Sequence, residues 1–236
     1  MRGILYGIGV GSGDPELLTI KAVRYIQEAD IICLPRIPKE ECRAYLIAKQ
    51  AVPEIEDKEC FCYDFKMIRD AEKLEKLHQE IYERIKDKIS EGRKIAFLTI
   101  GDPLTYSTFS YILDKVKSDG TTVEIISGIT SYNAIAARLR IALCEGDEEL
   151  HIGTGTGDIK KLLALPGTKV IMKTGRKIKE VKFALEQIEQ EEDVQVSAVT
   201  NCGLPDEAIY YGAAEIPLDD YMTTIVVKPG PKSGAR

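Results

Sequence analysis

The sequence has few of the residues that usually build a metal site. It contains only two histidines, His78 and His151, and its six cysteines are scattered apart from the pair Cys60 and Cys62. We expect these two cysteines to point to opposite faces of a strand, which is poor geometry for a metal, and we expect all six to be free thiols. We place His78 on the surface of a long helix and His151 at the start of a strand. The sequence therefore predicts no metal and no catalytic histidine.

Long apolar runs and an excess of positive charge are also missing. No apolar run reaches the roughly 20 residues that a membrane-spanning helix needs. The formal net charge is −6, from 32 basic and 38 acidic residues, which argues against a general nucleic-acid binder. The opening segment, Met1–Tyr6, begins with a charge and apolar residues, but glycines soon interrupt it, so we interpret it as a strand rather than a signal peptide. We therefore expect a cytoplasmic protein without nucleic-acid or membrane partners.

What the chain does contain is the alternation of an α/β protein. The 236 residues, 44% of them hydrophobic, suffice for one large or two small globular domains. Strand-like and helix-like patterns alternate, which predicts a largely parallel sheet. The expected strands are 4–9, 30–34, 95–100, 123–126, 151–154, 169–173, 194–200 and 223–228. The expected helices include 107–116, 178–189 and a long one that ends at Gly92. A hinge at 117–121 would divide the chain into an N-terminal lobe, 1–118, and a C-terminal lobe, 119–236.

A glycine-rich turn, Gly7–Pro15, follows the first expected strand. Glycines at alternate positions allow a tight turn and the close approach of a ligand. A dinucleotide-binding turn is one interpretation, but the spacing differs from G-x-G-x-x-G, and Asp14 would place a negative charge near a pyrophosphate. By itself the motif fits a structural loop as well as a ligand loop.

Two further turns follow strands of the same lobe. Gly101–Ser107 begins with Gly-Asp-Pro, and Ser127–Ser131 places small hydroxyl residues before a helix. Each alone is compatible with a helix cap. In open α/β sheets, however, ligands bind beyond the carboxyl ends of the strands, so that such turns can line one crevice.

In their order and spacing the three turns resemble the tetrapyrrole methylase family. The family's G-x-G-P-G-D-x-x-L-L-T-x-K-A pattern corresponds to Gly9–Ala22, with Ser12 in place of the usual proline. The similarity continues through Val199–Asp206 and Thr223–Val227. Within the family, the pattern is most similar to the C(20)-methyltransferases of precorrin-2 or cobalt-factor II. Pro35 stands where methylases of uroporphyrinogen III carry a carboxylate, which argues against that substrate.

The resemblance implies two α/β lobes with a ligand cleft between them, a homodimer, and S-adenosyl-L-methionine as methyl donor. By position, the donor contacts would be Ser12, Gly101, Asp102, Thr105, Thr130, Ser131, Met172, Cys202 and Thr224. An acidic tetrapyrrole substrate requires local cations, and the expected substrate contacts are Arg36, Tyr106, Arg138 and Lys173. Lys39, Arg43, Arg140 and Arg176 are further basic candidates. No catalytic base is identified, and Tyr106 is the one side chain considered near the reaction.

Three alternatives remain open at this point. A related methylase could act on a later corrin intermediate or on uroporphyrinogen III. A nicotinamide-dependent oxidoreductase could use the first glycine turn, and a tetrapyrrole carrier could bind without catalysis. Donor turnover and the position of the new methyl group distinguish them.

Overall fold

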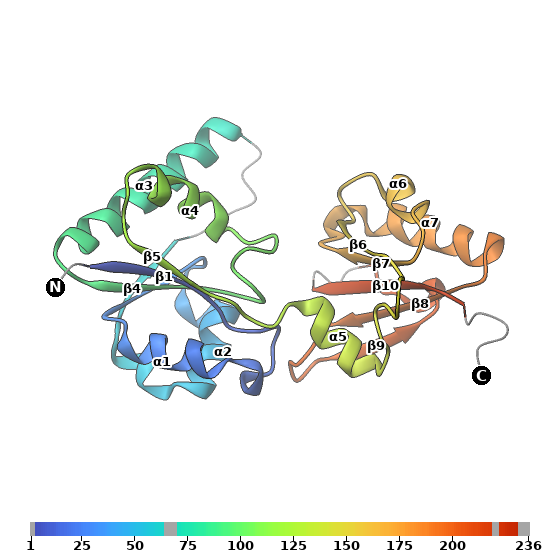
Figure 1. The fold of residues 1–236 in the computed structure, drawn as a ribbon, viewed down its shortest axis with the longest axis horizontal. Coiled ribbons are helices and arrows are strands. Elements are labelled where there is room, and N and C mark those ends of the chain that lie inside the picture. The colour runs from blue at the N-terminus through green and yellow to red at the C-terminus, as the bar shows by residue number, and fades with distance from the viewer. Residues whose placement is uncertain (1–2, 64–69, 219–221, 231–236) are drawn as a thin grey trace. The chain divides into compact units, whose positions relative to one another are not determined.

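The chain forms two compact units, Met1–Thr130 and Ser131–Arg236 (Figure 1). The structure is a computed structural model, and it describes residues 3–63, 70–218 and 222–230. The division falls after Thr130 rather than at the expected boundary of 118/119. The reason is that β5 (Val123–Ile126) pairs with β1 (Ile4–Gly9) and completes the first sheet.

The first unit is a parallel sheet covered by helices on both faces. Its strand order is β3-β2-β4-β1-β5, and every neighbouring pair is parallel. The remaining strands are β2 (Ile31–Leu34), β3 (Glu59–Cys62) and β4 (Lys94–Thr99). The helices are α1 (Ile20–Glu28), α2 (Arg43–Ala51), α3 (Ala71–Ser90) and α4 (Phe109–Ser118), with short 3-10 turns at Pro15–Leu17, Lys39–Glu41 and Pro53–Asp57.

Alternate side chains of the strands point to opposite faces of the sheet and pack into two separate hydrophobic cores. Tyr6 and Ile8 of β1 pack with α1 and α2, whereas Leu5 joins Phe109 and the other apolar residues of α3 and α4. Figure 1 shows the two helix pairs on opposite sides of this sheet. Because parallel strands buried on both faces all end at one edge, the loops after β1, β4 and β5 leave the sheet together.

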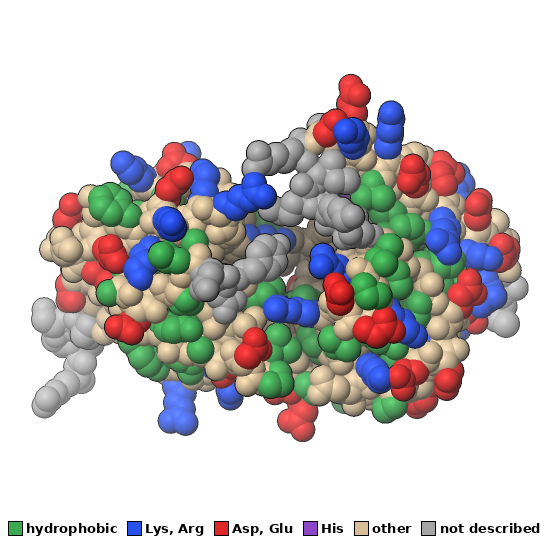
Figure 2. Space-filling model, turned by 180° about the vertical axis from the view of Figure 1, so that it is seen from behind, with side chains coloured by type: hydrophobic (Ala, Val, Ile, Leu, Met, Phe, Trp, Pro, Cys, Tyr) green, Lys and Arg blue, Asp and Glu red, His purple; other side chains and the backbone are tan. Residues whose placement is uncertain are grey.

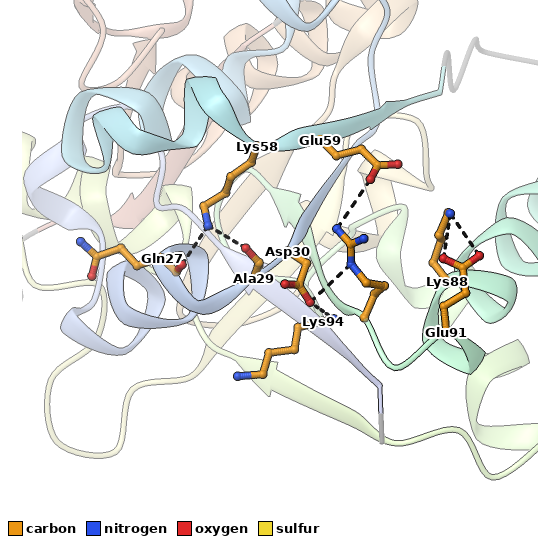
Figure 3. Close-up of polar contacts among 9 residues, drawn as sticks. Gln27, Ala29, Asp30, Lys58, Glu59, Lys88, Glu91 and Lys94 are labelled. Atoms are coloured by element: carbon orange, nitrogen blue, oxygen red, sulfur yellow. Dashed lines mark hydrogen bonds and ion pairs between the residues drawn. The ribbon is translucent and has the colours of Figure 1, made fainter. Parts of the chain in front are cut away.

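The opposite, amino edge of this sheet is held by polar contacts (Figure 3). The Lys58 ammonium donates to the carbonyl oxygens of Gln27 (2.8 Å) and Ala29 (2.6 Å) at the end of α1. Asp30 accepts from the backbone N–H of Lys94 at 2.7 Å. These contacts link the starts of neighbouring elements, so this edge has a structural role.

The second unit contains a mixed sheet rather than a parallel one. Its order is β6-β7-β10-β8-β9; only β6 and β7 are parallel, and the other pairs are antiparallel. The strands are β6 (Leu150–Thr154), β7 (Thr168–Met172), β8 (Val194–Thr200), β9 (Ala208–Tyr211) and β10 (Thr223–Pro229). The segment between β8 and β9 is too short for the crossover that parallel pairing requires. The expectation of a largely parallel sheet therefore holds for the first unit only.

One face of this second sheet packs on helices. The core joins Leu163 of α6 (Ile159–Leu163) and Leu185 of α7 (Ile178–Glu191) to strand residues such as Ile171. The unit begins with α5 (Ser131–Leu139) and includes 3-10 turns at Gly175–Lys177 and Ala213–Glu215. Within the described part of the chain, every helix is too short or too polar to cross a bilayer.

Candidate ligand-binding loops

Three glycine-containing loops meet at the carboxyl edge of the first sheet. The Gly101 N–H donates to the Gly11 carbonyl at 2.7 Å, and these residues form an isolated antiparallel bridge. A Cβ on Gly9 or on Gly128 would overlap the Gly101 carbonyl oxygen. The loops after β1, β4 and β5 are therefore in backbone contact, which only glycine permits at these positions.

Gly101 itself is different, because it is buried and yet a Cβ on it would overlap no other atom. Its φ is +71°, and a Cβ there would come no closer than 4.0 Å to the Ile129 carbonyl oxygen and the Thr130 Cα. A methyl-sized group at Gly101 would therefore fit in ordinary van der Waals contact with the loop after β5. A ligand can approach the main chain at this point.

Two buried hydroxyls of these loops lack a partner. The Oγ of Ser12 and the Oγ1 of Thr130 are buried and make no hydrogen bond in the described part of the chain. The two residues are only 4% and 8% exposed. Buried polar groups are nearly always satisfied, so unsatisfied hydroxyls beside an open space favour a polar ligand.

Asp102 connects the loops after β4 and β5 by hydrogen bonds. Its Oδ1 accepts from the Leu104 N–H at 2.9 Å, and its Oδ2 accepts from the Gly128 N–H at 3.1 Å. Thr105 follows in the same turn, where its N–H donates to the Asp102 carbonyl at 3.3 Å. Asp102 thus positions the backbone around Gly101, and its place as a direct donor contact stays a prediction.

The remaining donor candidates lie in the second unit, near the ends of β7 and β8 and the start of β10. Ile225 of β10 pairs with Ile171 of β7 and Ala198 of β8, so Thr224 and Met172 lie at the same edge of the sheet. The Thr224 hydroxyl donates to the Ser131 Oγ at 3.4 Å. Cys202, two residues after β8, is buried.

Sequence reasoning missed two hydroxyls at this edge. The Oγ1 atoms of Thr174 and Thr200 are buried without a partner among the described residues. Thr174 follows β7, which carries Met172, and Thr200 ends β8, two residues before Cys202. Only the position at a strand end could have drawn attention to them, because threonine is common in strands.

Left-handed backbone marks the same strand ends. Four non-glycine residues among the described ones have positive φ: Tyr106 (+50°), Arg140 (+57°), Lys173 (+51°) and Asn201 (+49°). Lys173 and Asn201 directly follow β7 and β8, and Tyr106 lies in the loop after β4. Such strain is concentrated at ligand sites in proteins.

The predicted basic residues occupy different environments. The Arg36 guanidinium lies 3.4 Å from the Glu41 carboxylate, and both side chains are exposed. Arg138, in contrast, makes a close ion pair with Glu207 at 2.6 Å, and Glu207 also accepts from the Gly203 N–H. Glu207 would thus compete with a substrate carboxylate for Arg138, whose role in substrate binding stays a prediction.

Lys173 follows β7 in an exposed position, yet desolvation by the surrounding protein lowers the pKa of its ammonium. A lysine that is accessible to solvent and also partly desolvated suits a carboxylate ligand, since an incoming anion replaces lost hydration.

Two expectations were wrong: that His78 lies on the surface of its helix, and that Cys60 and Cys62 point to opposite faces of their strand. His78 is buried, only 3% exposed, and stacks on Tyr111 at 4.5 Å between ring centroids, because it faces α4 rather than solvent. Cys60 and Cys62 lie on the same face of β3, with Phe61 on the other, since alternate strand residues share a face. Among the described residues, His, Cys, Asp and Glu side chains form no group of three suited to a metal.

Comparison with known proteins identifies the family. Residues 4–216 match the family model described as Tetrapyrrole (Corrin/Porphyrin) Methylases. The chain belongs to the tetrapyrrole methylase family. It is 37% identical over 229 residues to a probable cobalt-precorrin-2 C(20)-methyltransferase of Methanocaldococcus jannaschii, which covers 95% of each chain. It is 28% identical to the cobalt-precorrin-2 C(20)-methyltransferase of Salmonella typhimurium, over 79% of each chain.

Solved structures of tetrapyrrole methylases share the fold. A cobalt precorrin-4 methyltransferase superposes with a TM-score of 0.74 at 21% identity, covering 95% of this chain and 94% of the other. A uroporphyrin-III C-methyltransferase of Thermus thermophilus, complexed with S-adenosyl homocysteine, gives a TM-score of 0.71 at 17% identity, covering 96% and 97%. The predicted two-unit α/β fold is confirmed.

Proposed function

We propose that this methylase transfers a methyl group from S-adenosylmethionine to carbon 20 of precorrin-2 or cobalt-factor II in corrin biosynthesis. The observation that carries the proposal is the 37% identity, over 95% of both chains, to a probable cobalt-precorrin-2 C(20)-methyltransferase. The three loops around Gly101 support it, because a Cβ would fit beside the Gly101 main chain and two buried hydroxyls of these loops have no partner among the described residues.

The residues present fit this methyl donor. Gly101 and the Ile129–Thr130 backbone bound the space, and the hydroxyls of Ser12 and Thr130 provide hydrogen bonds for its polar groups. When bound, S-adenosylmethionine supplies a methyl group on a sulfonium sulfur, and its carbon–sulfur bond breaks as the new carbon–carbon bond forms. The protein's part is to hold the attacking carbon in line with the methyl carbon and the sulfur. Such positioning lowers the activation free energy by several kcal/mol.

We expect methylation at carbon 20 to proceed without a protein base. A meso carbon conjugated to ring nitrogens is already nucleophilic, and its proton can leave afterwards to water or to the macrocycle. General-base help is typically worth about 10²–10⁴-fold. Replacing any one Asp, Glu or His outside the donor loops should therefore lower kcat by less than about tenfold, and Tyr106→Phe should be equally mild. A thousandfold loss in steady-state assays of one such variant would contradict this account.

The proposal includes a cytoplasmic homodimer that binds no metal, nucleic acid or membrane. The six free thiols support a reducing compartment. Sedimentation equilibrium at micromolar concentration should give twice the chain mass, and a monomer at all concentrations would reject the dimer.

The reaction is tested by incubating the protein with methyl-labelled donor and precorrin-2, with and without cobalt. A single new methyl resonance on carbon 20 is the expected result, and the preferred form of the substrate follows from the two rates. A methyl group on a pyrrole carbon would reject the proposal in favour of a ring methylase. Calorimetric binding of a nicotinamide dinucleotide instead of the donor would favour an oxidoreductase, and binding without turnover would favour a carrier.

A further inference from the structure

Three large apolar side chains are exposed at the carboxyl edge of the first sheet. Ile37 is 51% exposed, Leu104 57% and Tyr106 42%. Ile37 lies in the loop after β2, and the other two lie in the loop after β4. Because β2 and β4 are parallel neighbours, with Cys33 opposite Phe97, both loops leave the sheet at the same edge.

Hydrogen bonds at both ends hold the loop after β4, in which Leu104 and Tyr106 are exposed. Near its start, Asp102 accepts from the N–H of Leu104. At its end, the Ser107 and Thr99 hydroxyls are hydrogen-bonded at 2.9 Å, and Ser107 Oγ also accepts from the Phe109 N–H at 3.1 Å. Flexible loops can fold apolar side chains inward, but a loop fixed at both ends keeps Leu104 in water.

This exposure leaves apolar surface in water, which carries a free-energy cost. Fully burying a leucine side chain is worth about 1.5–3 kcal/mol. Tyr106 adds backbone strain, with φ at +50°. A strained, rigid and apolar surface beside a ligand-binding edge indicates that a ligand covers it.

Basic side chains flank the apolar ones. Arg36 directly precedes Ile37, and its pair with Glu41 is long and exposed, so an incoming carboxylate can replace it at little cost. Lys39 follows two residues later and lies over the Tyr45 ring at 5.3 Å. An apolar centre with cations at one side matches a flat ring that carries carboxylates on its rim.

We propose that Ile37, Leu104 and Tyr106 form a platform that receives one face of the tetrapyrrole macrocycle, with Arg36 binding a rim carboxylate. The inference rests on the proposed function for the identity of this ligand. It assigns substrate recognition to apolar contact as well as to charge, and it adds Ile37 and Leu104 to the substrate-binding residues.

The test uses alanine variants of two platform residues and a planar probe. Leu104→Ala and Ile37→Ala should each raise the Kd of uroporphyrin, a planar octacarboxylate, about three- to tenfold, by loss of apolar contact area. The Kd of S-adenosylhomocysteine, measured by calorimetry, should not change. Phe183→Ala is the matched control, because Phe183 is 61% exposed on α7 in the other unit.

The possible outcomes separate the platform from the reaction. If both variants remain folded by circular dichroism and bind the porphyrin as tightly as the parent protein, the platform is wrong. If Phe183→Ala weakens binding equally, the effect is not local and the platform is also wrong. If porphyrin binding depends on Leu104 while precorrin-2 is not methylated at carbon 20, the platform stands and the proposed reaction fails.

Discussion

At the scale of single residues, Gly101 provides the sharpest test of the donor loops. A Cβ there would overlap no atom but φ is positive, so Gly101→Ala should cost about 1 kcal/mol of stability from backbone strain. If the donor occupies the open space, the added methyl group should also raise the Kd of S-adenosylhomocysteine roughly tenfold or more, which corresponds to about 1.4 kcal/mol. Thermal unfolding and calorimetry measure the two effects separately.

Gly120 offers a matched control for this substitution. Its φ is +73°, and a Cβ there would meet nothing within 4 Å. Gly120→Ala should therefore carry the same strain without any change in donor affinity. Equal affinities in the two variants would mean that the turn at Gly101 is purely structural.

His78 should make stability depend on pH. Burial lowers its pKa, Glu75 partly offsets this, and Lys115 lowers it further. Because the unfolded state then binds the proton more readily, unfolding should become easier as the pH falls through the unfolded value of about 6.5. His78→Phe keeps an aromatic ring against Tyr111 and should flatten this slope in denaturant titrations between pH 8 and 5.

The other histidine provides the comparison. His151 lies 3.1 Å from the Glu149 carboxylate near the surface. His151→Gln removes this other imidazole and serves as the reference for the slope of His78→Phe. If His78→Phe has the same slope as the parent, the buried imidazole is not its source.

At the scale of elements, sequence reasoning succeeded where the hydrophobic pattern was regular. The bounds expected for β1, β5 and β8 agree with the structure, because each is rich in apolar residues and lies between turn residues. It missed β3 and β9, which are short edge strands of four residues with partly exposed side chains. β5 is also a four-residue edge strand, but it has no exposed residue, whereas β3 begins with an exposed residue and β9 alternates half-buried with exposed ones.

The candidate site was predictable in its loops but not in its contacts. The three turns could be found from their glycines and their place after strands. The Gly11–Gly101 bridge and the pairing of Arg138 with Glu207 depend on residues far apart in the sequence. No local pattern predicts such contacts, because they form only when the sheets assemble.

Asp102 links two elements, which predicts a specific effect of replacing it. Its two carboxylate oxygens accept from different N–H groups, on the loops after β4 and β5. An amide has one acceptor oxygen, so Asp102→Asn should leave one N–H facing an amino group and cost about 1–3 kcal/mol. Chemical denaturation measures this loss, and donor affinity should fall with it because the gap beside Gly101 is no longer fixed.

Asp14 is the natural comparison for this variant. Its carboxylate accepts from the Glu16 N–H at 2.8 Å through Oδ1, at the start of a short 3-10 turn. Asparagine caps such turns as well as aspartate does, so Asp14→Asn should be nearly neutral. Equal losses in the two variants would show that the double acceptor role of Asp102 is unimportant.

At the scale of the whole molecule, an acidic protein has to bind an acidic substrate. The net charge is −6, and on the face shown in Figure 2 basic and acidic side chains are interspersed across each unit. With acidic side chains among the basic ones of the described residues, we expect no broad positive field on that face to draw in a polyanion. Recognition must then come from a few cations at short range, where screening by salt is weaker than for the distant charges.

This arrangement predicts how salt and single charges affect substrate binding. The KM for the tetrapyrrole should rise between 50 and 500 mM salt, because close cation–carboxylate contacts weaken. Arg36→Ala should raise this KM about three- to tenfold at low salt, since a charge-assisted contact is lost, and should reduce the salt dependence. Arg24→Ala removes the same charge from α1, where Arg24 faces Glu28 at 3.9 Å, and should change KM less than about twofold. Both variants shift the net charge equally, so any difference between them isolates the local contact. Equal effects would show that the protein's overall charge, rather than Arg36, controls substrate binding.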